Sequence, residues 1–258
     1  MIPRLWRHRA LFMTMVRRQY QLRYRQSFVG FAWALVPPLA TLLVGTVLFR
    51  GVFRVRTGEN PYILTTMAAL VPWTFFANSI SVGIPSVIGS ISMVTRLSFP
   101  RAVLPLSAVG LSFIDFLVAG VGFVSLAFIQ GDGLPLTSLW VLVLLLVEIP
   151  LVVGVVLLGS AMNVFARDIR LAVPLLVQFW LFLTPVMYPL SEVTNPMLRS
   201  FYLANPMTGI VESFRRALLD GLPPDVGMLV PALIGAGAAL LVGLWYFQST
   251  EPRFADVI

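Results

Sequence analysis

Long apolar stretches with at most one charged residue each constrain this 258-residue sequence more than any other feature. Six of them are apolar and long enough to cross a hydrocarbon core of ~30 Å as helices of ~20 residues. They cover residues 28–49, 61–84, 103–129, 137–163, 171–190 and 227–248. The composition agrees, because 58% of the residues are hydrophobic and only 11% are charged, against about 25% charged in soluble domains. We therefore predict an all-α integral membrane protein, with one transmembrane domain over residues 1–258.

A further apolar segment, residues 201–211, is too short to cross a membrane. It lies between the fifth and sixth predicted spans, and two Asn-Pro pairs beside it, at 195–196 and 205–206, are natural turn points. We expect residues 191–225 to form a re-entrant or interfacial hairpin on the external side.

The arginines are distributed unequally between the two sides of such a membrane protein. With six spans, the side that holds both termini carries 12 arginines and three acidic residues, and the other side carries six of each. An excess of basic residues marks the cytoplasmic side. We therefore expect both termini to be cytoplasmic, and we attribute the net charge of +7 to a membrane surface and not to nucleic acid.

The first 26 residues are basic and precede the first span. A secretory signal has this order, but its apolar run is shorter and ends at a cleavage site, whereas here the run continues to Phe49. We predict an amphipathic helix lying at the cytoplasmic interface, although Arg9 and Arg23 interrupt its apolar stripe. Four of its arginines are candidates for binding either a lipid pyrophosphate or ordinary lipid headgroups. They are Arg17, Arg18, Arg23 and Arg25.

Several kinds of chemistry are excluded by residue counts. All 18 basic residues are arginine, there is no cysteine, and His8 is the single histidine. A P-loop needs a lysine and a disulfide needs cysteines, which this sequence lacks, and a zinc site of histidines and cysteines needs more of these ligands than one histidine. We find no Asp-x-Asp motif for a nucleotide sugar. We predict no catalytic residue, metal or cofactor in this chain, so any ATP must be hydrolysed by another subunit.

Two short basic loops on the predicted cytoplasmic side are candidates for docking a partner protein. Their alternative role is simply to anchor the spans by the positive-inside effect. The first loop contributes Arg96, Phe99, Pro100 and Arg101, and the second contributes Arg167, Asp168 and Arg170. We expect Asp168 to pair with one of its two neighbouring arginines.

Asp115 and Glu148 lie within predicted spans, where a carboxylate costs ~2.5–3.5 kcal/mol to insert. A proton relay is one interpretation. Because the spans contain no histidine, lysine or arginine as a partner, we favour hydrogen bonds to serine or threonine of neighbouring helices.

Aromatic residues near the span ends are typical of an interfacial belt. Their flat surfaces also suit sugar rings, so a glycan path is the alternative. The candidates are Trp33, Trp73, Phe76, Phe179, Trp180, Phe182 and Tyr188. In the last span, Gly235, Ala239 and Gly243 have the spacing that permits close helix packing.

Short motifs, in order along the chain, resemble those of ABC transporter type-2 permeases that export polysaccharide. They are Tyr24–Leu35, Phe99-Pro100-Arg101 with Leu104–Ser107, Arg167–Arg170 with Val173-Pro174, Thr184–Leu190, Asn205–Glu212 with Phe214-Arg215, and Phe254–Ile258. One departure is Pro37, where relatives often carry a polar residue such as glutamine.

The resemblance implies a half-transporter of the bacterial cytoplasmic (inner) membrane. Such permeases form homodimers of six-helix chains, paired with two P-loop ATPase subunits that bind Mg-ATP. They export lipid-linked glycans, such as undecaprenyl-diphosphate-linked O antigen, capsule or teichoic acid. In this family the loop between spans 2 and 3 contacts the ATPase, which would give the two basic loops their role, and short re-entrant helices precede span 6.

Two alternatives stay open at this point. A type-2 permease for a drug or a lipid would share the fold and differ in cargo. A proton-coupled carrier would work without an ATPase and would use Asp115 and Glu148.

Overall fold

The computed structural model describes residues 8–24, 30–48, 60–91, 93, 99–131 and 133–254. Within these ranges the chain is built from helices and short turns, without a β-strand, which confirms the all-α prediction. Arg25 and Arg96, two of the predicted site residues, lie outside the described residues.

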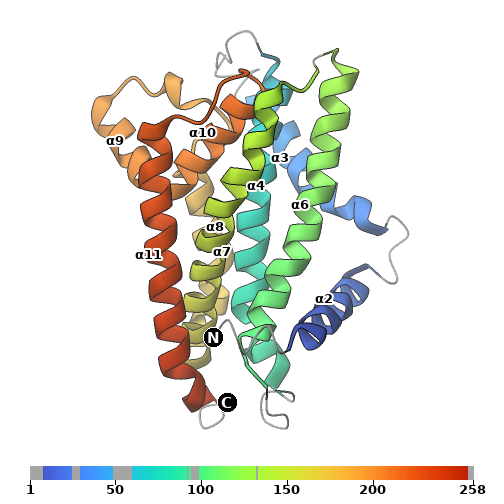
Figure 1. Ribbon diagram of the computed structural model, residues 1–258, viewed down its shortest axis with the longest axis vertical. Helices are drawn as coiled ribbons and strands as arrows, with labels where there is room; N and C mark the ends of the chain where they lie inside the picture. The colour runs from blue at the N-terminus through green and yellow to red at the C-terminus, as the bar shows by residue number, and fades with distance from the viewer. Residues whose placement is uncertain are drawn as a thin grey trace.

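Four long helices form the bundle (Figure 1). They are α4 (Tyr62–Gly83), α6 (Val103–Ile129), α7 (Trp140–Phe165) and α11 (Val226–Thr250). By length and composition, these four are able to cross a membrane. They coincide with four of the six stretches predicted from the sequence.

The first predicted span is shorter than expected in the part that the structure describes. A 3₁₀ helix, η1 (Gly30–Leu35), is followed by α3 (Val36–Gly45), and the whole apolar helical segment runs over Ala32–Leu48. Pro37 and Pro38 lie in the first turn of α3. Because proline lacks an N–H, the first turn is where a helix tolerates it best, so the pair marks the start of α3.

The fifth predicted span, residues 171–190, is only partly helical. Helix α8 (Asp168–Phe182) begins earlier and ends earlier than the uncharged run. Asp168 suits the positive end of the helix dipole. The end follows from Pro185, which disfavours helical geometry at Thr184. At this turn the Val186 N–H donates to the Thr184 carbonyl at 2.7 Å.

Two shorter helices, α9 (Pro196–Ala204) and α10 (Pro206–Leu218), occupy the predicted hairpin region. Each begins at one of the Asn-Pro pairs, with the asparagine side chain as its N-cap: Asn195 accepts from the Met197 N–H and Asn205 from the Met207 N–H. Helix α10 is largely buried against α4, α7 and α11, whereas α9 is largely exposed. At 13 residues, α10 is too short to span a membrane.

The closest helix crossing in the described bundle joins α7 and α11. A Cβ atom added at Gly154 would lie 2.3 Å from the Ala239 carbonyl carbon, and one added at Gly243 would lie 2.2 Å from the Gly154 oxygen. Two residues of the predicted small-residue stripe, Ala239 and Gly243, therefore face α7 at this crossing. The third, Gly235, lies against Pro206 at the start of α10.

Short 3₁₀ turns complete the described chain. They are η3 (Ile84–Ser86), η4 (Ile88–Ser90), η5 (Leu136–Leu139), η6 (Leu190–Glu192) and η7 (Glu251–Arg253).

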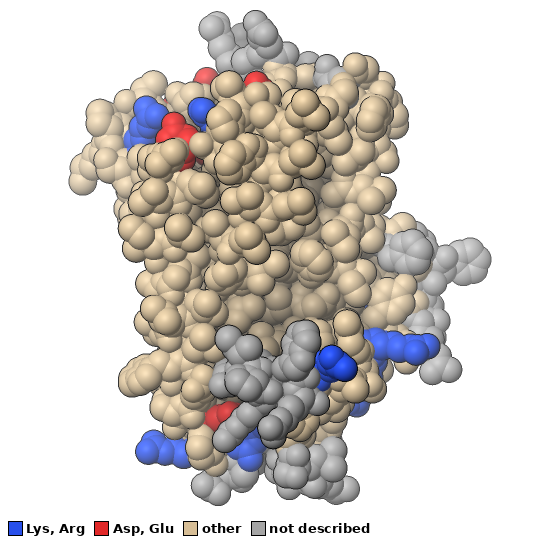
Figure 2. Space-filling view, viewed as in Figure 1, with Lys and Arg blue, Asp and Glu red and all other residues tan. Residues whose placement is uncertain are grey.

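The charged side chains on the visible face lie toward the two ends of the bundle (Figure 2). Basic side chains dominate the end that carries α2 (Arg9–Tyr24) and the last turn of α11, while charges of both signs lie at the opposite end. The surface between them has no charge in this view. A belt of this kind is what an apolar hydrocarbon layer requires.

Candidate functional site

Helix α2 packs along α6 near the basic end of the bundle (Figure 1). Gly110 of α6 permits this approach, because a Cβ there would lie 3.0 Å from Cγ2 of Val16 and 3.3 Å from Cζ of Phe12. The Gln19 side-chain amide donates to the Ser107 hydroxyl at 2.7 Å. The amphipathic helix predicted from the sequence is therefore fixed to the bundle by both apolar and polar contacts.

Asp115 receives two donors from the end of α2. Nη1 of Arg23 lies 2.8 Å from Oδ2 of Asp115, and the Tyr24 hydroxyl donates to Oδ1 at 2.7 Å. The carboxylate is almost fully buried, at 4% exposure, and the arginine side chain is 35% exposed. Burial, followed by the neighbouring Asp115, raises the pKa of Tyr24, so its hydroxyl remains a donor at physiological pH.

The prediction that Asp115 has no cationic partner and bonds to serine or threonine was wrong. The spans do lack a cation, but α2 brings Arg23 to Asp115 from outside them, with its long side chain extended toward the buried carboxylate. The signal was present in the sequence, because Arg23 interrupts the apolar stripe of α2.

Arg17 and Arg18 are exposed on α2. Nη1 of Arg18 lies 3.0 Å from the Met93 sulfur, a weak acceptor. These two arginines are accessible to an anionic headgroup, whereas Arg23 already has Asp115 as its counter-charge.

The described part of the first basic loop is folded onto the bundle. Phe99 packs against a cluster of buried apolar residues at this end. The buried residues of this cluster are Val87, Ala102, Leu104, Leu157, Ala161, Val164, Phe247 and Phe254. Pro100 is half-buried, and Arg101 contacts Glu251 of η7 through both its backbone N–H and its guanidinium.

The second basic loop lies between α7 and α8. Arg167, Asp168 and Arg170 are all exposed there. Among the described residues, the ion pairs are Arg23–Asp115 and Arg215–Glu212, so the expected pairing of Asp168 with a neighbouring arginine is absent. Its position in the first turn of α8 places Asp168 at the helix N-terminus instead.

Glu148 of α7 is fully buried. Neither of its carboxylate oxygens has a hydrogen-bond partner among the residues that the structure describes. The expected bonds to serine or threonine are therefore not formed, and no described contact offsets the cost of burying this side chain.

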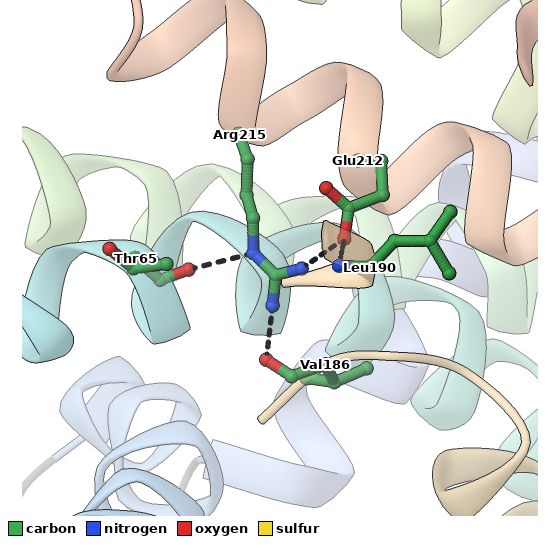
Figure 3. A network of polar contacts seen from close by, with 5 residues as sticks. All are labelled: Thr65, Val186, Leu190, Glu212 and Arg215. Atoms are coloured by element: carbon green, nitrogen blue, oxygen red, sulfur yellow. Dashed lines mark hydrogen bonds and ion pairs between the residues drawn. The ribbon is translucent and has the colours of Figure 1, made fainter. Parts of the chain in front are cut away.

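A polar network at the opposite end of the bundle centres on Arg215 of α10 (Figure 3). Its guanidinium donates to the Thr65 carbonyl at 3.1 Å, to the Val186 carbonyl at 2.6 Å and to Oε1 of Glu212 at 2.5 Å. The same glutamate oxygen accepts the Leu190 N–H at 2.8 Å. The network fastens α10 to α4 and to the chain that follows α8.

The sequence places Glu212 and Arg215 in the predicted external re-entrant or interfacial hairpin and does not predict that they form a buried network. Their i, i+3 spacing on a helix was the available signal. Arg215 is 3% exposed and Glu212 is 8% exposed. The two residues therefore form a buried ion pair that holds α10 against its neighbours.

A hollow of about 840 Å³ borders the network. Its lining carries charges of both signs and comes from α4, η6, α9, α10, α11 and the chain after α10. The lining residues are Asn60, Thr65, Pro189, Leu190, Ser191, Glu192, Arg199, Glu212, Arg215, Arg216, Leu219, Asp220 and Met228.

The aromatic candidates for a glycan path fall into two groups. Trp73 and Phe76 are buried in the bundle, where Phe76 meets the Trp180 ring edge to face with 4.9 Å between centroids. Trp180 is half-buried, and its indole N–H donates to Oδ1 of Asn205 at 3.1 Å. These three are core residues and offer little surface to a ligand.

The other four aromatic candidates are accessible. Trp33, Phe179 and Phe182 are 52%, 67% and 63% exposed. Tyr188 is half-buried, and its hydroxyl lies 2.6 Å from that of Tyr202. Phe182 and Tyr188 also border an apolar hollow of about 360 Å³ between α3 and α8.

Comparison with known proteins places these features in a family. Residues 10–219 match the ABC-2 type transporter family. The chain is 29% identical to the O-antigen export system permease protein RfbA of Myxococcus xanthus, covering 100% of this chain and 99% of the relative.

Two further relatives are also similar over nearly their whole length. An O-antigen export system permease protein RfbA of Klebsiella pneumoniae is 25% identical, covering 96% of this chain and 95% of the relative. The polysialic acid transport protein KpsM of Escherichia coli is 23% identical, covering 94% and 92%. The matched region contains α2, the described bundle up to α10, and both basic loops, and the chain therefore belongs to the ABC-2 type transporter family.

Proposed function

We propose that this chain is the multi-pass permease subunit of an ATP-driven exporter of polysaccharide in a bacterial cytoplasmic membrane. The observation that carries this function is the similarity over the whole chain to an O-antigen export permease. The similarity to a polysialic acid transport protein supports a polysaccharide cargo as well. We further propose that the glycan is linked to a lipid such as undecaprenyl diphosphate, as in O-antigen, capsule or teichoic-acid export.

ATP hydrolysis belongs to a partner subunit in this proposal. The sequence has no lysine for a P-loop, and the family consists of transporters. Two ATPase subunits, each binding Mg-ATP, would dock at the basic end, where Arg167, Asp168 and Arg170 are exposed. From the sequence, Arg96 of the first basic loop is also assigned to this docking surface.

We propose that two copies of the chain form the permease, each with six spans, a re-entrant α9–α10 pair and cytoplasmic termini. The basic end in Figure 2 supports this orientation. Apolar side chains on α3 and α8 remain exposed in the single chain, among them Leu43, Val44 and Phe179. A second copy or lipid would cover them.

The lipid-linked substrate would meet two sets of residues. Arg17, Arg18 and Arg25 would attract its phosphate groups or the surrounding headgroups at the interface. Trp33, Phe179, Phe182 and Tyr188 would present aromatic surfaces to the sugars. Trp73 and Phe76 are left out of this path because they are buried.

Purification from native membranes in mild detergent, with mass spectrometry of the co-eluting components, tests the proposal. A stoichiometric ATPase with a Walker lysine, together with a lipid-linked glycan, is the expected result. The same ATPase with a drug or a glycan-free lipid would transfer the assignment to another cargo. A stable oligomer of this chain alone would contradict it.

A further inference from the structure

The C-terminal turn of α11 holds the segment that leads into α6. The Arg101 N–H donates to Oε1 of Glu251 at 2.8 Å, and Nη1 of Arg101 donates to the backbone carbonyl of the same glutamate. Two residues 150 positions apart in the sequence are thus joined by both a backbone donor and a side-chain donor. Two hydrogen bonds between the same residues hold the segment before α6 in one orientation against Glu251, as well as close to it.

The glutamate also lies next to the start of α6, because it accepts from the residue before the N-cap. Ala102, the N-cap of α6, supplies no side-chain hydrogen bond to the first turn. The Glu251 carboxylate lies beside this turn, at the positive end of the helix dipole, where a negative charge is favourable. A carboxylate from another element therefore lies beside the start of α6.

Phe254 anchors the turn on its other side. It is fully buried, with ring contacts to Phe247 of α11 at 5.4 Å and to Phe165 of α7 at 6.1 Å between centroids. The Arg101 guanidinium lies 5.9 Å from the Phe254 ring centroid, within cation–π range. Through its contacts with η7 and Phe254, Arg101 is therefore linked to α7 and α11. It is also linked to α6, which begins two residues later in the chain.

We propose that Arg101 is a positioning residue that acts through Glu251, and that the C-terminal turn 251–254 forms part of the surface on which the ATPase subunit docks. The inference rests on the proposed function. It changes the role expected for Arg101, because the guanidinium is directed at the C-terminal turn and does not need to touch the ATPase. A displacement of the loop before α6 would then move the ends of α6, α7 and α11 together.

A double-mutant cycle on the purified permease–ATPase complex tests whether Arg101 acts through Glu251. R101M removes the guanidinium donor and E251A removes the carboxylate acceptor, so each breaks one of the two hydrogen bonds that together fix the segment. If both bonds are needed, each variant should lower glycan-stimulated ATP hydrolysis about tenfold, a typical effect of mutations in a coupling network. The double variant should be no worse than the more impaired single variant. R216Q is the control, because Arg216 lies at the opposite end of the bundle, where its Nε donates to the Pro223 carbonyl, and it should couple normally.

Additive losses in the double variant would overturn the inference, because Arg101 and Glu251 would then act independently. Normal coupling in E251A would also overturn it. If E251A fails to fold, E251Q keeps an acceptor oxygen for the Arg101 N–H and should retain coupling, and loss of coupling in a folded E251Q would count against the inference.

Hydrogen exchange of the wild-type chain gives a test without substitutions. Backbone amides of Glu251, Arg253 and Phe254 should be more protected with the ATPase subunit bound than without it, and unchanged exchange would contradict the docking surface. A wild-type chain that binds no ATPase would instead refute the proposed function, and this inference with it.

Discussion

Nη1 of Arg23 lies 2.8 Å from Oδ2 of Asp115, an ion pair that joins an amphipathic helix to the middle of a long apolar helix. The two partners are buried to different extents, because the carboxylate is 4% exposed and the arginine side chain is 35% exposed. This asymmetry determines what each substitution should do.

R23Q should destabilise the fold more than D115N. Loss of the arginine leaves a buried carboxylate without its counter-charge, at a cost of about 3 kcal/mol, whereas Arg23 can reach solvent when Asp115 is neutralised. Thermal unfolding in one detergent compares the two variants. The double variant R23Q/D115N should be more stable than R23Q, and equal effects of the two single substitutions would argue against the pair.

The crossing of α7 and α11 should not tolerate a methyl group. G154A and G243A place a Cβ atom within 2.4 Å of main-chain atoms, so the helices must separate, at about 1–3 kcal/mol. Thermal unfolding measures the loss. G237A is the matched control on α11, because no atom lies within 4 Å of the added Cβ, and its stability should not fall. Equal stability of all three variants would show that the helices do not cross here.

R215Q should be more harmful than E212Q. The arginine has three separate acceptors, and its loss leaves Glu212 buried without a cation, which costs about 3–5 kcal/mol. E212Q keeps an oxygen for the Leu190 N–H. Urea unfolding and the yield of folded protein report the difference. R216Q is a control on the same helix, since Nε of Arg216 donates to the Pro223 carbonyl near the surface, and it should be close to wild type.

Asp220 predicts a pH dependence of stability. Partial burial raises the pKa of Asp220 above its ordinary value of 3.8, although Arg216, Asn60 and Arg215 lower it in part. The Asp220 carboxyl keeps its proton to a higher pH in the folded state than in the unfolded state. The free energy of unfolding should therefore fall as the pH rises from 3.8 through the raised pKa. The melting temperature of D220N should show a smaller fall than wild type over that window. An identical pH profile would mean that Asp220 titrates alike in both states.

Local sequence signals predicted much of the bundle. Long apolar runs located α4, α6, α7 and α11, since a membrane helix needs that length of apolar chain. The Asn205-Pro206 pair, predicted as a turn point, coincides with the start of α10, where Asn205 is the N-cap. The predicted span 171–190 extends too far, because α8 ends at Phe182, just before Pro185, although the uncharged run continues.

Contacts between distant segments were beyond these signals. Arg23 and Asp115 are 92 positions apart, and Arg101 and Glu251 are 150 apart. Contacts of this kind depend on which helices pack together, and hydrophobic periodicity does not show which helices are neighbours. Trp73 and Phe76 illustrate the same limit, because their aromatic character suits a sugar-binding surface and a core equally well.

The central claim is that this chain exports a lipid-linked glycan with energy from a partner ATPase. Transport in proteoliposomes that contain the chain, the ATPase that co-purifies with it and the lipid-linked glycan tests it most directly. The account predicts that glycan reaches the opposite leaflet only when both subunits and Mg-ATP are present. Transport by the chain alone, driven by a pH gradient without nucleotide, would contradict it.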